Sequence, residues 1–264
     1  MAAFLFPYLC ERILSFIFKQ SENRSLMPSQ KIIIALDGFA ACGKSTLAKS
    51  LAKKLNYIYV DTGAMYRAVT LYFLQEKISL EDEQAIAQAL DNIRIDFRHR
   101  AGANHCFLNG EDVEEEIRKM YVSKWVSPVA AISAVRRFLV KQQQAMGRFK
   151  GLVMDGRDIG TVVFPEAELK LFMTASYEVR SQRRLAELQA KGLNASLEEV
   201  RENLMERDQI DSSREDSPLR KADDAITIDN SELSMNEQLD LALDLAYKAI
   251  EKKKCSVSAS LLVS

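Results

Sequence analysis

The stretch Lys31-Ile-Ile-Ile-Ala-Leu-Asp37, followed at once by Gly38-Phe-Ala-Ala-Cys-Gly-Lys-Ser-Thr46, decides the fold. Its second half has the form GxxxxGK[ST] directly after an apolar run, which predicts a buried strand that ends in a phosphate-binding loop. Backbone N–H groups of such a loop converge on phosphate oxygens, its lysine reaches the outer phosphates, and its serine hydroxyl can ligate Mg²⁺. Residues 44–55 continue with apolar side chains at helical spacing, as the motif requires, which argues against an ordinary glycine turn. We therefore expect a polyphosphate ligand, while the reaction stays open.

Composition and charge limit the class of protein. The chain has 264 residues, of which 47% are hydrophobic and 28% charged, enough for one α/β domain with at most a small insert. The formal net charge of −1 gives no electrostatic reason to expect nucleic acid or a membrane as a partner. The four cysteines lack metal-ligand spacing and one lies in the phosphate loop, so we expect free thiols in a reducing cytoplasm.

Alternating strand and helix patterns organise the rest of the chain. Short apolar runs at 31–36, 57–60, 151–154, 169–173 and 225–228 are separated mostly by segments with helical period. This alternation predicts a five-stranded parallel sheet with helices on both faces, formed by residues 31–77 and 126–252.

One segment breaks this alternation. Residues 93–113 hold two β-like runs and an Asn109-Gly110 pair, a strong hairpin signal. With a helix at 80–92 and an acidic segment at 112–119, they predict an inserted subdomain over 78–125. A single long helix over 128–148 is then expected to return the chain to the sheet.

Local signals mark several helix ends. Ser196-Leu-Glu-Glu199 and Ser234-Met-Asn-Glu237 have the form of capping boxes, and Gly192 is expected to end a helix that begins near Ser176. The last helix is predicted over 235–252, followed by a frayed tail over 253–264.

The first 30 residues form an extension that we expect to lie outside the core. The apolar part, up to Lys19, is too short and too interrupted by Glu11 and Arg12 to span a bilayer. A polar linker follows, in which Met27 is a candidate for the true start. A peripheral amphipathic anchor and a packing segment are the alternatives.

Two clusters of polar residues accompany the phosphate loop in the first half of the chain. Asp61-Thr-Gly-Ala-Met-Tyr-Arg67 follows the second predicted strand, where parallel sheets expose their ligand-facing loops. Thr62 could instead cap a helix, and Arg67 could face solvent. Arg136 and Arg137 lie on the predicted long helix, after Ser127-Pro128, and taken alone such a pair indicates a solvated face.

Two further clusters lie in the second half. Met154-Asp-Gly-Arg-Asp-Ile-Gly160 ends an apolar strand, so that Asp155 could hold Mg²⁺ through water and Arg157 could clamp a phosphate; a salt-bridged turn is the alternative. Arg207, Asp211 and Arg214 are spaced for one helical face, where internal ion pairing is the alternative. A phosphate loop combined with arginines on several loops suits phosphoryl transfer between two phosphorylated ligands, because arginine and Mg²⁺ neutralise the charge of the moving group. Attack by water would instead make an NTP hydrolase.

Taken together, GFAACGKST, DTGAMYR, the Asn-Gly hairpin, DGRDIGTVVFP and RDQIDSSREDSPL resemble the bacterial-type cytidylate kinases, nucleoside monophosphate kinases with a P-loop NTPase core. The resemblance covers about residues 30 to 250. It implies an adenylate-kinase-like core, a monophosphate-binding insert at 78–125, a short lid near 176–192, and phosphorylation of CMP and dCMP by ATP with Mg²⁺. A cytoplasmic monomer that acts on small nucleotides is expected.

The resemblance also assigns residues position by position. ATP would be held by Gly38, Phe39, Ala40, Ala41, Cys42, Gly43, Lys44, Ser45 and Thr46, with Ser45 on Mg²⁺ and Asp155 on it through water. The CMP phosphate and sugar would be surrounded by Thr62, Arg67, Arg157, Arg207, Asp211 and Arg214, of which Asp211 meets the ribose. Ser127, Arg136 and Asp158 would bind the cytosine edge, with Asp158 accepting from the exocyclic amine. Lys44, Arg157, Arg207 and Arg214 are the expected catalytic residues, and Arg183 and Arg184 on the lid either reach the transferring phosphate or remain solvated.

Three other functions would also use a phosphate loop. A GTPase should carry an NKxD sequence and a DxxG switch, and neither is supplied here. A kinase for another small acceptor, such as UMP, AMP or shikimate, is the nearer alternative. A non-catalytic nucleotide-binding regulator is disfavoured because Lys44 and Arg157 are both present.

Overall fold

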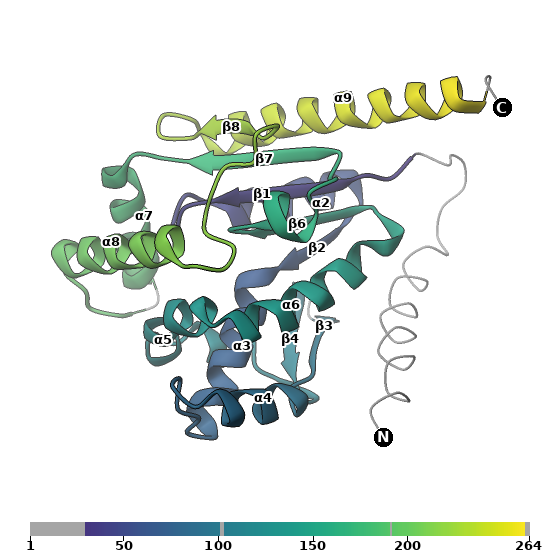
Figure 1. The fold of residues 1–264 in the computed structure, drawn as a ribbon. Coiled ribbons are helices and arrows are strands. Elements are labelled where there is room, and N and C mark those ends of the chain that lie inside the picture. Colours follow the sequence, from purple (N-terminus) through teal and green to yellow (C-terminus); the bar gives the residue numbers. More distant parts are fainter. Residues whose placement is uncertain (1–29, 101–102, 191, 262–264) are drawn as a thin grey trace.

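A five-stranded parallel sheet forms the centre of the molecule. The computed structural model describes residues 30–100, 103–190 and 192–261. Its main sheet consists of β1 (Ile33–Gly38), β2 (Ile58–Asp61), β6 (Leu152–Gly156), β7 (Leu169–Thr174) and β8 (Ile226–Asp229). The strand order is β2-β6-β1-β7-β8, and every neighbouring pair is parallel. The predicted five-stranded parallel sheet is confirmed (Figure 1).

Both faces of the sheet are covered, because side chains of the central strand β1 point alternately to two separate cores. Ile33 and Ala35 belong to the core on one face, which also contains side chains of α3 (Thr62–Gln75) and α6 (Ser133–Met146). Ile34 and Leu36 belong to the other core, together with side chains of α2 (Lys44–Leu55) and α9 (Met235–Leu261). An uninterrupted apolar run is what a strand buried on both faces requires.

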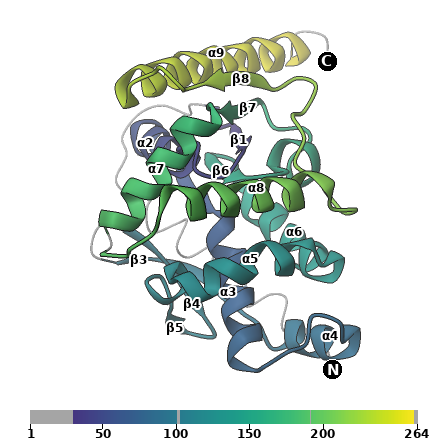
Figure 2. The same cartoon turned by 90° about the vertical axis from the view of Figure 1, so that its left-hand side faces the viewer.

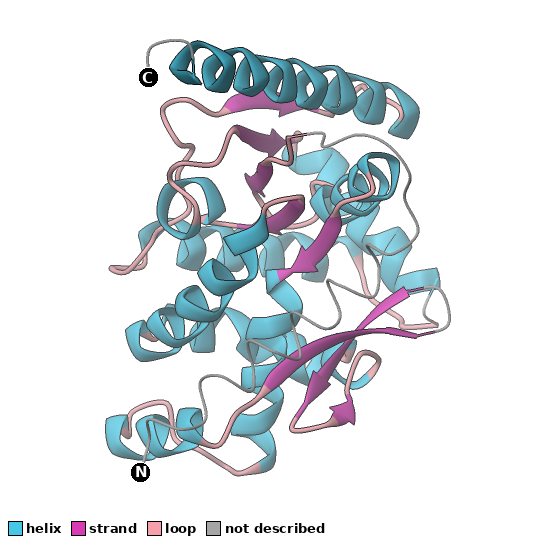
Figure 3. Ribbon diagram, turned by 90° about the vertical axis from the view of Figure 1, so that its right-hand side faces the viewer, coloured by secondary structure: helices cyan, strands magenta, loops and turns pink. Residues whose placement is uncertain are grey.

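A small antiparallel sheet lies apart from the main one, as the sequence predicts. It contains β3 (Ile95–Arg100), β4 (Ala103–Leu108) and β5 (Glu111–Asp112) in that order and is visible below the main sheet in Figure 3. Asn109 and Gly110 have φ angles of 51° and 93°, the left-handed conformation for which the Asn-Gly pair is selected in tight turns. Helix α4 (Glu83–Asp91) precedes this sheet, and the 3₁₀ segment η1 (Glu116–Arg118) follows it.

The prediction of a single helix over 128–148 is wrong. Helix α5 (Met120–Ala131) contains Pro128, and α6 begins only at Ser133, after an extended residue at Ile132 with φ −72° and ψ 117°. A proline usually marks a helix start or boundary, whereas here the helix continues for three residues beyond it before it ends. Ser127 and Arg136 therefore come from two helices. The only tryptophan of the sequence, Trp125, lies on α5 with 48% of its surface exposed.

The last helix is longer than predicted. Helix α9 continues to Leu261, so residues 253–261 are helical and not a frayed tail. Lys253 Nζ donates to the carbonyl oxygen of Lys31, at a distance of 3.3 Å, and forms an ion pair with Glu168. These contacts hold the helix against the start of β1. In Figure 1, α9 runs along the β8 edge of the molecule.

Two helices project beyond the C-terminal ends of the strands. They are α7 (Tyr177–Ala190) and α8 (Leu197–Ser213), at the left in Figure 1 and toward the viewer in Figure 2. Ser196 caps α8 in a capping box with Glu199, and Ser234 and Glu237 exchange the same pair of hydrogen bonds at the start of α9. Both predicted capping boxes are confirmed. Within the described ranges, no helix combines the length and the apolar character needed to cross a lipid bilayer.

Candidate active site

A cleft with a volume of about 580 Å³, lined by many charged side chains, lies where the strands of the main sheet end. This volume is in the range of small-molecule sites. All the side chains assigned to the acceptor nucleotide by the resemblance line this one cleft: Thr62, Arg67, Ser127, Arg136, Arg157, Asp158, Arg207, Asp211 and Arg214. They come from α3, α5, α6, α8 and the turn after β6, so the fold brings together residues up to 152 positions apart.

The phosphate loop forms one wall of the cleft. Of its residues, Ala40, Ala41, Gly43, Lys44, Ser45 and Thr46 line the cavity. Phe39 instead packs edge-on against Phe172, with ring centroids 5.9 Å apart, and the Cys42 thiol lies 3.0 Å from the carbonyl oxygen of Phe39. Gly38 has a φ of 145°, and a Cβ there would lie 2.0 Å from the carbonyl oxygen of Met173, so no other residue fits.

Lys44 is a buried cation at the base of this loop. Its side chain donates to the carbonyl oxygen of Phe39. Burial lowers its pKa, and the nearby positive charge of Arg157 lowers the pKa further. A buried ammonium group beside a guanidinium favours the binding of an anion, because a bound anion would offset both the desolvation of the ammonium group and its repulsion from the guanidinium.

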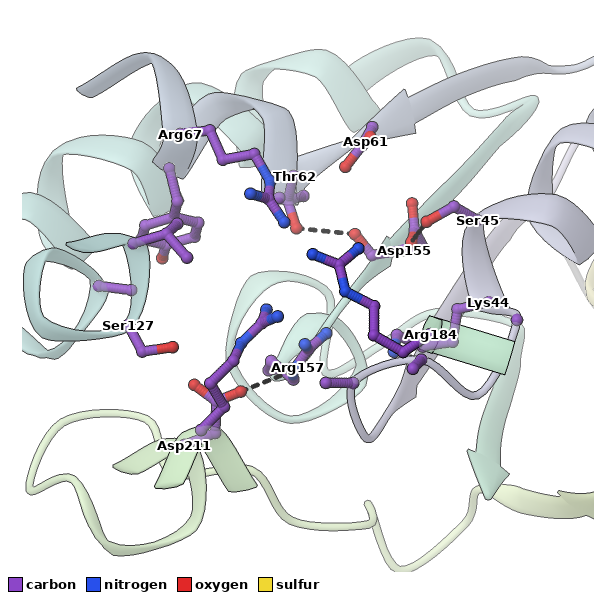
Figure 4. Close-up of a pocket in the computed structure, with 18 of the residues that line it drawn as sticks. Lys44, Ser45, Asp61, Thr62, Arg67, Ser127, Asp155, Arg157, Arg184 and Asp211 are labelled. Atoms are coloured by element: carbon purple, nitrogen blue, oxygen red, sulfur yellow. Dashed lines mark hydrogen bonds and ion pairs between the residues drawn. The ribbon is translucent and has the colours of Figure 1, made fainter. Parts of the chain in front are cut away.

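Ser45 and Asp155 form an oxygen pair next to Lys44. Ser45 Oγ donates to Asp155 Oδ2 at 2.8 Å (Figure 4). Burial raises the pKa of Asp155 to about 6, and the charge of Asp61 adds to this shift. Mg²⁺ is usually held by one or two carboxylates, waters and substrate phosphates, so this donor set fits it. Among the described residues, no group of three or more His, Cys, Asp or Glu is placed to hold a metal ion.

Four arginines concentrate positive charge in the same cleft. Burial lowers the pKa of Arg67 to about 9, and the charge of Arg207 contributes. Burial likewise lowers the pKa of Arg207 to about 10, with Arg157 as the next cause. Arg184 adds to both shifts, and Figure 4 shows Arg67, Arg157 and Arg184 around one space. Mutually repelling guanidinium groups in a cleft are the expected form of a phosphate site before its ligand arrives.

Arg136 and Asp158 form a buried ion pair at one end of the cleft. Arg136 is 1% exposed and Asp158 is 3% exposed, and the guanidinium donates to Asp158 Oδ2. A solvated face is therefore the wrong interpretation for Arg136, although Arg137 is exposed. Asp158 also does not belong to a self-contained salt-bridged turn, because its partner lies on α6. Buried Ser127 lines the same cavity from α5.

Helix α8 supplies the acidic partner of Arg157. Arg157 Nε donates to Asp211 Oδ2 at 2.8 Å. Arg207 and Asp211 lie on the helix as predicted, but Arg214 is its C-cap, with extended backbone, and donates to the carbonyl oxygen of Ser217 at 2.8 Å. Arg214 also contacts Asp211 Oδ1 at 3.4 Å, so the predicted alternative of internal ion pairing describes part of this cluster.

The two lid arginines have different partners. Arg183 donates twice to Asn230, to its side-chain oxygen and to its carbonyl oxygen, both at 2.9 Å. Asn230 in turn donates to the carbonyl oxygen of Cys42 in the phosphate loop at 2.8 Å. Arg184 pairs with Glu187 of its own helix, and Figure 4 shows it reaching into the cleft.

Sequence reasoning missed several residues that shape the site. Asp37 accepts from the backbone N–H groups of Ile159 and Gly160, at 2.8 and 2.7 Å, and so fixes the turn that carries Asp158. Its place at the end of the first strand, before the glycine loop, was the available signal. Arg118 of η1 donates to Asp61 Oδ2 at 2.8 Å.

The start of α3 differs from one expectation, because its cap is Asp61. Asp61 accepts from Ala64 N at 3.0 Å, so Thr62 is not the cap. Thr62 Oγ1 donates instead to the carbonyl oxygen of Asp155 at 2.7 Å.

Comparison with known proteins places the chain among one group of relatives. The family model described as cytidylate kinase matches residues 34–248. Cytidylate kinase of Parabacteroides distasonis is 57% identical over 229 residues, which cover 84% of this chain and 99% of that protein. The proteins of the same name from Phocaeicola vulgatus and Flavobacterium johnsoniae are 57% and 56% identical over 79% and 84% of this chain, and 93% and 99% of their own lengths.

Solved structures give a weaker comparison. A shikimate kinase from Bacteroides thetaiotaomicron has a TM-score of 0.42 and 12% identity, covering 82% of this chain and 98% of that chain. A likeness of this strength carries no argument about substrate.

Proposed function

The chain belongs to the cytidylate kinase family, and on this premise we propose that it transfers the γ-phosphoryl group of ATP to CMP and dCMP, giving ADP with CDP or dCDP. The observation that carries the proposal is the shared cleft, which is lined by both the phosphate loop and the arginine cluster. Two anionic ligands can therefore meet end to end inside one cleft.

The donor half is the phosphate loop. The backbone from Gly38 to Thr46 would cradle the ATP phosphates, and Lys44 would exchange its contact with the Phe39 carbonyl for phosphate oxygens. Ser45, and Asp155 through water, would hold Mg²⁺, which neutralises phosphate charge when it is bound.

The acceptor half contains the remaining charged groups. We assign the CMP phosphate to Arg67, Arg157 and Arg207, with Thr62 and Arg214 at its margin, and the ribose to Asp211. The cytosine edge would be read by Ser127, Arg136 and Asp158. Because Asp158 is buried and uses Oδ2 for Arg136, its other oxygen would discriminate between bases: the exocyclic amine of cytosine can donate to that oxygen, whereas uracil presents an oxygen there and supplies no donor.

Catalysis in this arrangement depends on position and charge. Lys44, Arg157, Arg207 and Arg214 would surround the transferred group, and Arg184 reaches toward the same space from α7. Negative charge that spreads over the moving phosphoryl group would meet cations that are already desolvated, so little reorganisation is needed.

A coupled assay of ADP release tests the function. With ATP and Mg²⁺, we expect kcat/KM for CMP and dCMP to exceed that for UMP and AMP by at least about tenfold, the effect of one unsatisfied buried polar group. Equal rates with UMP would reject the role of Asp158 in base selection. Faster turnover of AMP or shikimate would replace the proposed substrate.

The remaining parts of the proposal concern the metal, the oligomeric state and the cellular location. We propose Mg²⁺ as the metal, a monomer as the active form, and the cytoplasm as the location. The free thiols of Cys42 and Cys106 support a reducing compartment. Loss of activity on chelation, and sedimentation of the active protein at the mass of one chain, are the expected results.

A further inference from the structure

Tyr59 lies beneath the proposed metal site. Its hydroxyl donates to Asp155 Oδ1 at 2.8 Å, and Ser45 Oγ donates to Asp155 Oδ2 at 2.8 Å. Each oxygen of this carboxylate therefore has its own partner, one from β2 and one from α2. Asp155 is 4% exposed and Tyr59 is 8% exposed, so water competes little with either hydrogen bond.

The fold explains why this tyrosine reaches Asp155. In the register of β2 and β6, Tyr59 pairs with Val153 and Asp61 pairs with Asp155. Side chains two residues apart along a strand point to the same face, so Tyr59 lies diagonally across from Asp155. Its ring packs in the core under α2 with Val153 and has its centroid 5.6 Å from Lys49 Nζ, while its hydroxyl end meets the Asp155 carboxylate.

We propose that Tyr59 is a positioning residue for the metal: its hydroxyl holds Asp155 in the orientation that turns Oδ2 and the Ser45 hydroxyl toward Mg²⁺. This inference rests on the proposed function, in which Mg²⁺ accompanies ATP at Ser45 and Asp155. Without the hydroxyl, Oδ1 would be a buried carboxylate oxygen that lacks this donor, and the carboxylate would turn to find another. Groups that orient the ligands of a metal in this way commonly contribute tenfold or more to its affinity.

Tyr57, directly before β2, offers a matched control. Its hydroxyl accepts from the backbone N–H of Ile32, at 3.2 Å, near the opposite end of the sheet. Tyr57→Phe and Tyr59→Phe each remove one hydroxyl and keep the ring, and only Tyr59 contacts Asp155.

The test measures binding of ADP by calorimetry over a series of Mg²⁺ concentrations, starting from none in the presence of chelator. For Tyr59→Phe we expect the Mg²⁺ concentration that gives half of the gain in ADP affinity to rise about tenfold, with metal-free ADP binding changed by less than about twofold. Activity lost at low Mg²⁺ should be restored at high Mg²⁺. Tyr57→Phe should match the unmodified enzyme.

A double-mutant cycle separates positioning from general damage. In an Asp155→Asn background, Tyr59→Phe should cause no additional change in Mg²⁺ dependence, because its target is already altered. Thermal melts confirm folding, and Tyr59→Leu serves as a second variant that should show the same Mg²⁺ shift with a larger loss of Tm.

Three results would overturn the inference: an unchanged Mg²⁺ midpoint in Tyr59→Phe, an equal shift in Tyr57→Phe, or full additivity with Asp155→Asn. If ADP binding by the unmodified enzyme does not respond to Mg²⁺, the proposed metal role falls together with this inference. If the unmodified enzyme responds and Tyr59→Phe responds identically, only the inference about Tyr59 falls.

Discussion

Lys44 illustrates how much of the proposed chemistry depends on a single buried charge. It is 5% exposed and donates to a carbonyl oxygen of the loop. We expect Lys44→Met to lower kcat by roughly 10²- to 10³-fold, because it removes charge stabilisation that develops in the transition state. Steady-state kinetics and ATP binding measured side by side would check this. Weaker ATP binding with unchanged kcat would contradict the catalytic role.

Asp158 is best tested with an isosteric change. Replacing it by alanine would leave Arg136 buried without its partner, at a cost of about 3–5 kcal/mol of stability. Asp158→Asn keeps one acceptor for Arg136 and removes the charge. We expect kcat/KM for CMP to fall about 10- to 100-fold while that for UMP changes little, since the amide can donate to uracil. Discrimination that survives the substitution would show that another group reads the base.

Asp37 makes stability depend on pH. Burial raises its pKa to about 7, whereas in the unfolded chain the pKa is near 3.8. Between about pH 4 and 7 the folded state keeps a proton that the unfolded chain has released, so this contribution to the free energy of unfolding is full below pH 4 and is lost as the pH rises through 7.

The corresponding experiment compares how steeply Tm depends on pH in the unmodified protein and in Asp37→Asn. Asp37→Asn should lower Tm at all pH values, because its amide group opposes one backbone N–H. It should also remove part of the decline in Tm between pH 4 and 7. Parallel Tm curves for the two proteins would show that Asp37 does not titrate in this range.

The residues of the site differ in how far the sequence could identify them. Lys44, Arg67 and Arg157 follow strands or helix starts in recognisable motifs, so their meeting at one sheet edge was predictable. Tyr59 and Asn230 gain their importance only from contacts across the strand order β2-β6-β1-β7-β8. That order is not written in any local pattern, so these contacts could not be foreseen.

At the scale of elements, capping residues predicted helix boundaries more reliably than proline did. Ser196 and Glu199 begin α8 as predicted, because a side chain that satisfies free backbone N–H groups acts locally. Pro128 misled the prediction, since tertiary packing of α5 against α3 and α8 outweighs the local penalty. The bend at Ile132 is what turns Ser127 and Arg136 toward one cavity.

The cap of α8 allows an element-scale prediction. Ser196→Ala should lower the free energy of unfolding by about 1 kcal/mol, because it removes the capping hydroxyl, and should leave kcat nearly unchanged. Urea unfolding measures the first effect and initial rates the second. Ser213→Ala at the other end of the helix, where the hydroxyl bonds only the Gln209 carbonyl, should have a smaller effect. A large fall in kcat for Ser196→Ala would mean that this helix end takes part in turnover.

For the whole molecule, charge is distributed in a way that the overall composition conceals. The formal net charge is −1, yet eight arginines and Lys44 line one cleft. The cleft is assembled from both halves of the chain, on either side of the antiparallel insert. The predicted extension, residues 1–30, lies outside the described residues except for Gln30, and every residue assigned to the site lies after it.

A truncation tests this view of the whole chain. A protein that begins at Met27 should keep kcat, KM for CMP and Tm within experimental error, because the described residues supply the cleft and both cores without the removed segment. Rate and melting measurements on the purified full and shortened chains would check this. An insoluble or inactive product would show that the removed segment contributes to the fold.

The position of Trp125 has a practical consequence. It is the sequence's only indole, it is half exposed, and it lies two residues before Ser127 on α5, at the end of the cleft proposed for cytosine. Indole emission therefore comes from a single known place, next to the proposed site of the acceptor base. The protein carries its own optical reporter there, by which nucleotide arrival could be timed in a stopped-flow instrument without attaching a dye.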